Sequence, residues 1–325
     1  MKQALICCAI AFVITAAIGP SVIRYLRKMK FGQKILEIGP KWHMNKQNIP
    51  TMGGFMFIIG IALAVILGGL ITGTLSVHAL AILGLSAAYG AVGLVDDYAK
   101  IKKKENAGLT PRQKLVLQIL VAAVFILVLF LESDGLPSLM IPFTGISIDL
   151  PWPVYIIFAA FVIVGTVNSV NLTDGVDGLS ASLAVVTIGT YLIAYHEELA
   201  DYSTAGVVFM GALLAYLWSN AKPSTLLMGD AGSRAMGFFI AILSLKCGHP
   251  FAFLLAAIVF IVDGSLGILK ISLKRFLHIS ILKNTRTPLH DHVRKNKGWS
   301  DEQVVARWLI LQCVASALLL LVVNG

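Results

Sequence analysis

The sequence predicts an all-α integral membrane protein, and three observations support this fold class. Hydrophobic residues make up 57% of the 325-residue chain and charged residues only 13%, about half the charged fraction of an ordinary soluble protein. The apolar residues form runs of about 20, the length of a helix that crosses a hydrocarbon core of about 30 Å. Lysine and arginine gather between alternate runs, as on one face of a multi-pass protein. We therefore expect a single polytopic domain, residues 1–325.

The apolar runs predict ten transmembrane helices. In chain order they cover residues 4–23, 53–73, 77–95, 114–131, 152–170, 178–195, 203–219, 233–247, 250–272 and 304–323. The first ends before a basic stretch at residues 24–30, and the third ends at Asp96-Asp97. The ninth contains Asp263, for which the sequence leaves both proton coupling and a packing role open. Because ten is even, both termini lie on one side of the membrane.

The distribution of basic residues predicts which side that is. The segments 24–52, 96–114, 219–234 and 270–307 hold seven, six, two and nine lysines and arginines, so 24 of the 26 lie on one face. Basic loops are typical of the cytoplasmic side, which makes both termini extracytoplasmic. The net charge of +9 therefore indicates topology and attraction to anionic membrane lipids, and we expect no nucleic-acid partner.

One extracytoplasmic link is long enough to form structure of its own. Residues 138–149 contain an apolar, β-prone stretch interrupted by Thr144-Gly145 and flanked by Pro137 and Pro151. This pattern predicts a small β-hairpin on the outer, periplasmic-side surface.

Five aspartates beside the spans form three clusters, and the predicted topology places all three on the cytoplasmic side. The clusters are Asp96-Asp97, Asp174 with Asp177, and Asp230. A carboxylate beside hydrocarbon is unfavourable unless a cation or a basic partner compensates its charge. The clusters therefore predict metal-assisted chemistry at a membrane surface.

The first two clusters differ in pattern. Asn171, Asp174 and Asp177 would form one polar stripe if a helix continued through them, and helix capping explains only one of the two aspartates. Asp96 and Asp97 point about 100° apart on a helix. One of them can therefore bind a metal while the other accepts a proton.

The third cluster and a later loop add groups suited to phosphate. Asp230 lies in Gly-Asp-Ala-Gly-Ser before a predicted helix, where backbone N–H groups suit phosphate oxygens and the carboxylate suits Mg²⁺. In an extended chain, His290 and His292 point one way and Asp291 the other. Zinc would need further soft ligands, so binding of a diphosphate by the imidazoles fits this loop better.

The chain resembles the phospho-N-acetylmuramoyl-pentapeptide transferase family, a branch of the polyprenyl-phosphate N-acetylhexosamine-1-phosphate transferases. The motifs that carry the resemblance are Pro50-Thr51-Met52-Gly53-Gly54, Asp96-Asp97-Tyr98-Ala99-Lys100, Gly108-Leu109-Thr110, Asn171 to Gly178, Met228 to Ser233, Thr287-Pro288-Leu289-His290 and Gly298-Trp299. The chain departs from the family's usual pattern at Asp291, Leu227 and Asn48-Ile49.

The resemblance implies a multi-pass enzyme of the bacterial plasma membrane with its active site on the cytoplasmic face. The implied reaction is Mg²⁺-dependent transfer of phospho-MurNAc-pentapeptide from UDP-MurNAc-pentapeptide to undecaprenyl phosphate, which forms lipid I and UMP. By position it implies Asp230 and Asp174 as Mg²⁺ ligands and Asp96, Asp97, Asp174 and His290 as catalytic residues. It implies substrate binding by Lys46, Thr51, Lys100, Asn171, Asp177, Asn220 and His292.

Two other functions remain alternatives on the sequence. A sister transferase would use UDP-GlcNAc or a similar short sugar nucleotide. An ion-coupled transporter would also use intramembrane carboxylates, on broken helices near the middle of the membrane. The sequence leaves the oligomeric state open, a homodimer included.

Overall fold

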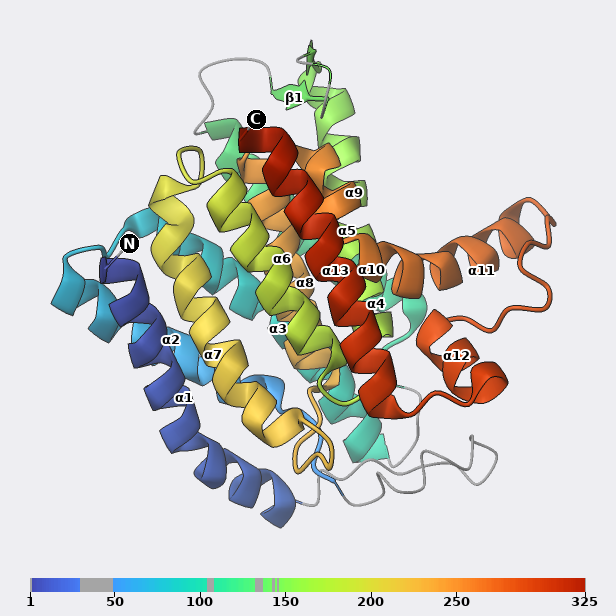
Figure 1. Cartoon of the computed structure of the whole chain (residues 1–325), viewed down its shortest axis with the longest axis horizontal. Helices are drawn as coiled ribbons and strands as arrows, with labels where there is room; N and C mark the ends of the chain where they lie inside the picture. The colour runs from blue at the N-terminus through green and yellow to red at the C-terminus, as the bar shows by residue number, and fades with distance from the viewer. Residues whose placement is uncertain are drawn as a thin grey trace.

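The computed structural model describes residues 2–29, 49–103, 108–131, 137–141, 144 and 146–324, with the side chains at 100–103, 111 and 324 left out. Most of these residues form a bundle of helices (Figure 1). The long elements are α1 (Lys2–Lys28), α2 (Gly54–Thr72), α3 (Val77–Lys103), α4 (Pro111–Leu131), α5 (Trp152–Thr173), α6 (Leu179–Ala194), α7 (Ser203–Asn220), α8 (Gly229–Lys246), α11 (Leu266–Phe276), α12 (Leu289–Lys297) and α13 (Asp301–Asn324). Short elements are η2 (Ala200–Tyr202), η3 (Pro250–Ala252), α9 (Phe253–Ala256), α10 (Ile258–Phe260), η4 (Ile261–Ser265), β1 (Ser138–Met140) and β2 (Ser147–Asp149).

The predicted multi-pass helical architecture is confirmed. Seven helices of the described residues are long and apolar enough to cross a membrane, and an eighth span results if the bent pair Pro250–Ala256 and Ile258–Phe276 counts as one. Outer helices expose large apolar side chains such as Leu70, Ile157 and Phe161. Such surfaces suit lipid, whereas a water-soluble monomer rarely exposes them in quantity. The number of ten spans stays a prediction.

Two predicted spans, α6 and α8, are not among the seven helices that are long and apolar enough to cross a membrane. α6 has only 16 residues, and α8 carries Asp230, Arg234 and Lys246 within its 18 residues. Every side chain of α8 from Ala231 to Leu245 is buried, because α2, α3, α5 and α6 pack around it. A helix enclosed by protein can carry charged groups that a lipid-facing helix cannot.

The expected ninth span, residues 250–272, is wrong as one continuous helix. The chain bends by 83° between Pro250–Ala256 and Ile258–Phe276, and Ala257 leaves the helical region with φ −138° and ψ 27°. Gln312 of α13 bonds the backbone groups that the bend releases: its Nε2 donates to the Ala256 carbonyl at 2.8 Å, and its Oε1 accepts from the Val259 N–H at 3.2 Å. Such compensation lets a helix break inside a membrane protein.

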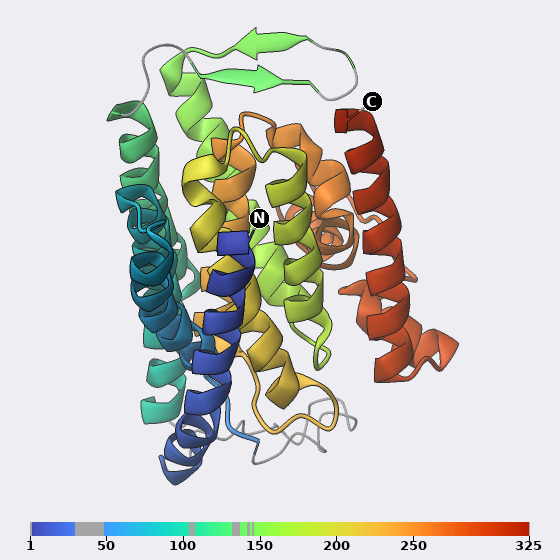
Figure 2. The same ribbon diagram turned by 60° about the vertical axis from the view of Figure 1, so that its left-hand side comes forward.

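The predicted hairpin is confirmed as a two-stranded antiparallel sheet. Ser138 pairs with Asp149, Leu139 with Ile148 and Met140 with Ser147. The hairpin lies across one end of the bundle (Figure 2), at the same end as the carboxyl end of α13. α12 and the amino end of α13 lie at the opposite end (Figure 1).

Candidate active site

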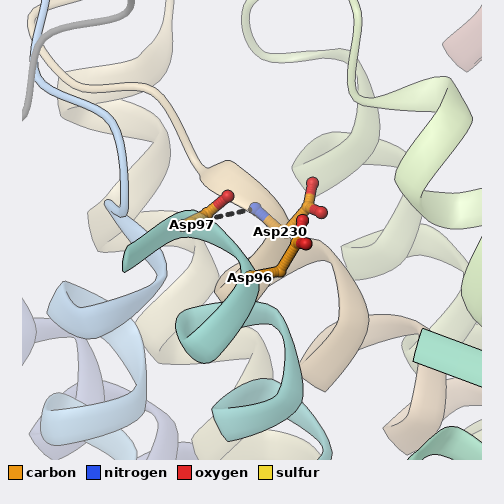
Figure 3. A group of neighbouring side chains, drawn as sticks. All are labelled: Asp96, Asp97 and Asp230. Carbon is orange, nitrogen blue, oxygen red and sulfur yellow. Dashed lines mark hydrogen bonds between the residues drawn. The ribbon is translucent and has the colours of Figure 1, made fainter. Parts of the chain in front are cut away.

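Three aspartates from two distant parts of the chain meet where the last turns of α3 approach the start of α8. Ligand oxygens of Asp96, Asp97 and Asp230 lie within 4.8 Å of one another. Asp96 is fully buried and Asp97 is 6% exposed, whereas Asp230 is partly buried. Figure 3 shows the carboxylates of Asp96 and Asp230 close together and that of Asp97 turned to the backbone of Asp230. Two of the three predicted clusters therefore converge.

The sequence around Asp230 explains its placement. Gly229 has φ +75°, a left-handed conformation that glycine adopts without strain, and the chain then enters α8. The first N–H groups of a helix have no partner within it, and the Asp230 N–H donates to Oδ2 of Asp97 at 2.9 Å. This bond joins the start of α8 to the end of α3.

The stretch from Pro50 to Gly54 packs against the segment that leads into the Asp230 turn and holds it through backbone hydrogen bonds. Gly53 N–H donates to the Leu227 carbonyl at 2.8 Å, and Leu227 N–H donates to the Pro50 carbonyl at 2.9 Å. A Cβ atom built on Gly229 would lie 3.0 Å from Oγ1 of Thr51. The hydroxyl of Thr51 therefore lies beside the turn that carries Asp230.

Cationic side chains contact two of the three carboxylates. Lys114 of α4 lies 2.8 Å from Oδ2 of Asp96, whose Oδ1 accepts from the Leu109 N–H at 2.7 Å. Arg234, one helical turn after Asp230, donates to Oδ2 of Asp230 at 3.1 Å and is almost fully buried. Sequence reasoning missed both cations, although the four-residue spacing of Asp230 and Arg234 on a helix favours such an ion pair.

Asn171 connects the second predicted cluster to Asp230. Its Nδ2 donates to Oδ1 of Asp230 at 3.1 Å and to Oγ of Ser233 at 2.7 Å. The side chain is thus fixed at the end of α5 against the first turn of α8. Both oxygens of the Asp230 carboxylate have protein donors, so its orientation is defined.

The geometry fits a hard divalent cation. Three carboxylates this close repel one another and favour a bound cation, and carboxylate oxygens are the ligands that Mg²⁺ prefers. Among the described residues, Asp96, Asp97 and Asp230 form a group whose ligand atoms lie close enough together to hold one metal ion. Asp174, the other expected ligand, is outside that group, and its metal role stays a prediction.

The predicted polar stripe over residues 171–177 is wrong, because α5 ends at Thr173. The chain turns through residues 174–178, and Gly178 has φ +81°, which ends any continuous helix. Asp177 instead accepts from the Ser224 hydroxyl at 2.8 Å. Asn220 Oδ1 accepts from the Gly178 N–H at 2.9 Å. Asn220 at the end of α7 and Ser224 in the loop that follows therefore both hold the turn after α5.

The loop after α7 is also anchored to α13. Nζ of Lys222 lies 3.2 Å from Asp301 and 3.3 Å from Glu302, and Nε of Arg294 lies 2.6 Å from Asp301. Desolvation opposes the charge on Lys222, but the two carboxylates outweigh it, so the pKa of Lys222 is raised. The ion pairs hold α12, α13 and the loop together.

The expected extended chain at His290 to His292 is wrong, because these residues lie in the first turn of α12. His290 is 2% exposed. His292 lies apart from it, with Nδ1 accepting from the Arg286 N–H at 3.3 Å. Asp291 Oδ1 lies 3.4 Å from Nη1 of Arg294. Helix geometry therefore separates the two imidazoles that an extended chain would align.

His290 points toward the turn that carries Asp174. A Cβ atom on Gly175 would lie only 2.3 Å from Nε2 of His290, so a larger residue there would displace the imidazole. Of the remaining predicted residues, Lys46 and the side chain of Lys100 lie outside the described part of the chain.

Replacing Gly93 with alanine is expected to displace the Asp230 turn. A Cβ atom there would lie 2.2 Å from the backbone oxygen of Asp230 and 2.6 Å from the backbone nitrogen of Ala231, and backbone atoms cannot rotate away. Overpacking of this kind costs about 1–3 kcal/mol, which thermal unfolding in detergent would detect. Gly84→Ala is the matched control on α3, because its Cβ would meet nothing within 4 Å. Equal melting temperatures of the two variants would contradict the close contact.

Comparisons with known proteins identify the family of the chain. The family model described as glycosyl transferase family 4 matches residues 79–248. Proteins named phospho-N-acetylmuramoyl-pentapeptide-transferase are similar along most of the chain. The one from Listeria welshimeri is 37% identical over 302 residues, 91% of each chain, and the one from Latilactobacillus sakei is 37% identical over 315 residues, 96% of each chain. A third, from Bacillus velezensis, is 37% identical over 295 residues, 90% of each chain. The chain therefore belongs to the phospho-N-acetylmuramoyl-pentapeptide transferase family.

Proposed function

We propose that this protein transfers phospho-MurNAc-pentapeptide from UDP-MurNAc-pentapeptide to undecaprenyl phosphate, which yields lipid I and UMP. The observation that carries the proposal is the meeting of Asp96, Asp97 and Asp230 in a chain of this family. We place the active site on the cytoplasmic face of a bacterial plasma membrane. That face is the basic one in the proposed topology of ten spans with both termini extracytoplasmic.

The reaction exchanges one phosphoanhydride for another. An oxygen of the lipid phosphate forms a bond to the phosphorus that bears the sugar, and the bond from that phosphorus to UMP breaks. The free-energy barrier arises mainly from bringing two anions together, so electrostatic stabilisation is the main task of the protein.

Three carboxylates are proposed to organise this charge. Asp96, Asp97 and Asp230 would hold Mg²⁺, which supplies positive charge for the diphosphate and the departing UMP. Asp96 and Asp97 are also the carboxylates proposed to accept the proton of the attacking phosphate. The bonds of Asn171 and Arg234 to Asp230 fix the orientation of that carboxylate, which preserves the site between turnovers.

The residues at the turn after α5 are proposed to bind the nucleotide and the sugar. Asp177 and Asn220 are held in place by Ser224 and the Gly178 backbone. Thr51 lies beside Gly229, where its hydroxyl can donate to a phosphate oxygen. Lys46, Lys100 and His292 stay candidate substrate-binding residues on their positions in the sequence.

The transporter alternative predicted a broken helix with a buried acid, and the bend before Asp263 has that form. Asp263, however, is bonded to His290 and Trp308, and Nε2 of that histidine lies against Gly175, next to Asp174. Its partners support a role at the transferase site better than ion transport.

The test is a donor comparison with the purified protein. With undecaprenyl phosphate and Mg²⁺ present, UMP release is expected from UDP-MurNAc-pentapeptide and not from UDP-GlcNAc. Chelation of divalent cations is expected to stop the reaction. Release from UDP-GlcNAc alone would instead identify a sister transferase.

A further inference from the structure

Asp263 is a fully buried carboxylate with three hydrogen bonds to two other elements. Its Oδ1 accepts from the backbone N–H of His290 at 2.7 Å and from Nε1–H of Trp308 at 3.2 Å. Its Oδ2 lies 2.7 Å from Nδ1 of His290. A buried carboxylate is costly unless such partners compensate it, so this arrangement needs an explanation.

The surrounding fold fixes Asp263 in position. It lies in η4, a single π-helical turn, and such turns often occur at functional sites. A Cβ atom on Gly264 would lie 2.3 Å from the backbone oxygen of Ser169, so the turn packs directly on α5. Trp308 also contacts Trp299, with 5.7 Å between ring centroids. Asp263 is therefore held between α5, α12 and α13.

These bonds determine how His290 is presented. With Nδ1 bonded to the carboxylate, the imidazole directs Nε2 toward Gly175, next to Asp174. A carboxylate that binds one ring nitrogen fixes the orientation and tautomer of a histidine whose other nitrogen performs the chemistry. It also balances the positive charge of an imidazole that donates to an anion through Nε2–H.

We propose that Asp263 is a positioning residue that holds His290 so that Nε2–H binds an anionic oxygen of the sugar-nucleotide donor. The inference deepens the proposed function and rests on it. It assigns Asp263 a role through His290, with Trp308 as the second donor that keeps the carboxylate in place.

Substitution of Asp263 with asparagine is the direct test. The change keeps the size of the side chain and removes its charge. Partners that orient metal-binding histidines contribute about 10–100-fold, and we expect a loss of the same size here. We expect kcat to fall by that factor while KM for UDP-MurNAc-pentapeptide changes less than about threefold, since the charge matters most as UMP departs. Asp263→Glu keeps the charge and is expected to retain more activity than Asp263→Asn.

A double variant separates positioning from stability. If Asp263 acts through His290, the variant Asp263→Asn with His290→Ala is expected to be no less active than His290→Ala alone. Gln312→Leu is the matched control, because Gln312 is a buried polar residue of α13 that bonds the bend instead of His290. The loss of stability that Gln312→Leu causes is expected to add to the effect of His290→Ala when the two changes are combined.

The outcomes are distinguishable. An Asp263→Asn loss that adds fully to that of His290→Ala, or activity within about twofold of wild type, would overturn the inference. If Asp263→Asn does not fold, Trp308→Phe removes the Nε1–H donor while it keeps an aromatic ring, and the activity that this change costs must vanish in the His290→Ala background. A wild-type protein that releases no UMP from either donor would refute the proposed function itself.

Discussion

Asp230→Asn is expected to lower kcat by about 10³-fold or more while the protein still inserts and folds. Groups that stabilise developing charge in a transition state contribute roughly 10²–10³-fold each, and Asp230 would also lose its place as a metal ligand. Asparagine retains the backbone N–H that donates to Asp97, so the turn is preserved. UMP release by the purified variant, compared with its melting temperature, is the measurement.

The control for this substitution is an aspartate away from the cluster. Asp149 lies exposed in β2, in the hairpin at the other end of the bundle, and Asp149→Asn is expected to retain full activity. Near-normal turnover by Asp230→Asn would remove Asp230 from the metal role and leave the cluster without its central ligand.

His290→Ala is expected to reduce activity by about 10²-fold, and Asp291→Ala by less than about threefold. His290 is buried against Gly175 and bonded to Asp263, whereas Asp291 is partly exposed and lies near Arg294. Asp291→Ala is the matched control for His290→Ala, because both residues belong to the first turn of α12. Steady-state UMP release measures both, and equally mild losses would exclude the whole loop from the active site.

The sequence predicted those features that depend on local pattern. Apolar runs of about 20 residues locate most of the helices, since length and hydropathy are properties of each segment alone. The hairpin at 138–149 follows from the turn at Thr144-Gly145 and its flanking prolines. The motif that surrounds Asp230 places a glycine turn before α8, as the structure has it.

The features that sequence reasoning missed depend on contacts between distant segments. The bend near Ala257 relies on Gln312, 55 residues later in the chain. Lys114 belongs to α4 but contacts Asp96 of α3. No periodicity within a single segment reports such pairs.

Local reasoning also chose the wrong conformation at two loops. The stripe over 171–177 assumed a continuous helix, but Gly175 packs against His290 and Gly178 takes a positive φ. The alignment of His290 with His292 assumed an extended chain after Pro288, whereas α12 begins at Leu289.

The most direct test of the central claim is whether a divalent ion at the three carboxylates reaches the donor's diphosphate. Mn²⁺ can replace Mg²⁺ at oxygen sites, and its unpaired electrons broaden the ³¹P resonances of nearby phosphates. Bound to the wild-type protein, Mn²⁺ is expected to broaden both phosphorus resonances of UDP-MurNAc-pentapeptide, and Asp230→Asn is expected to abolish the effect. Equal broadening with wild type and with Asp230→Asn would show that the ion binds elsewhere and would contradict the account.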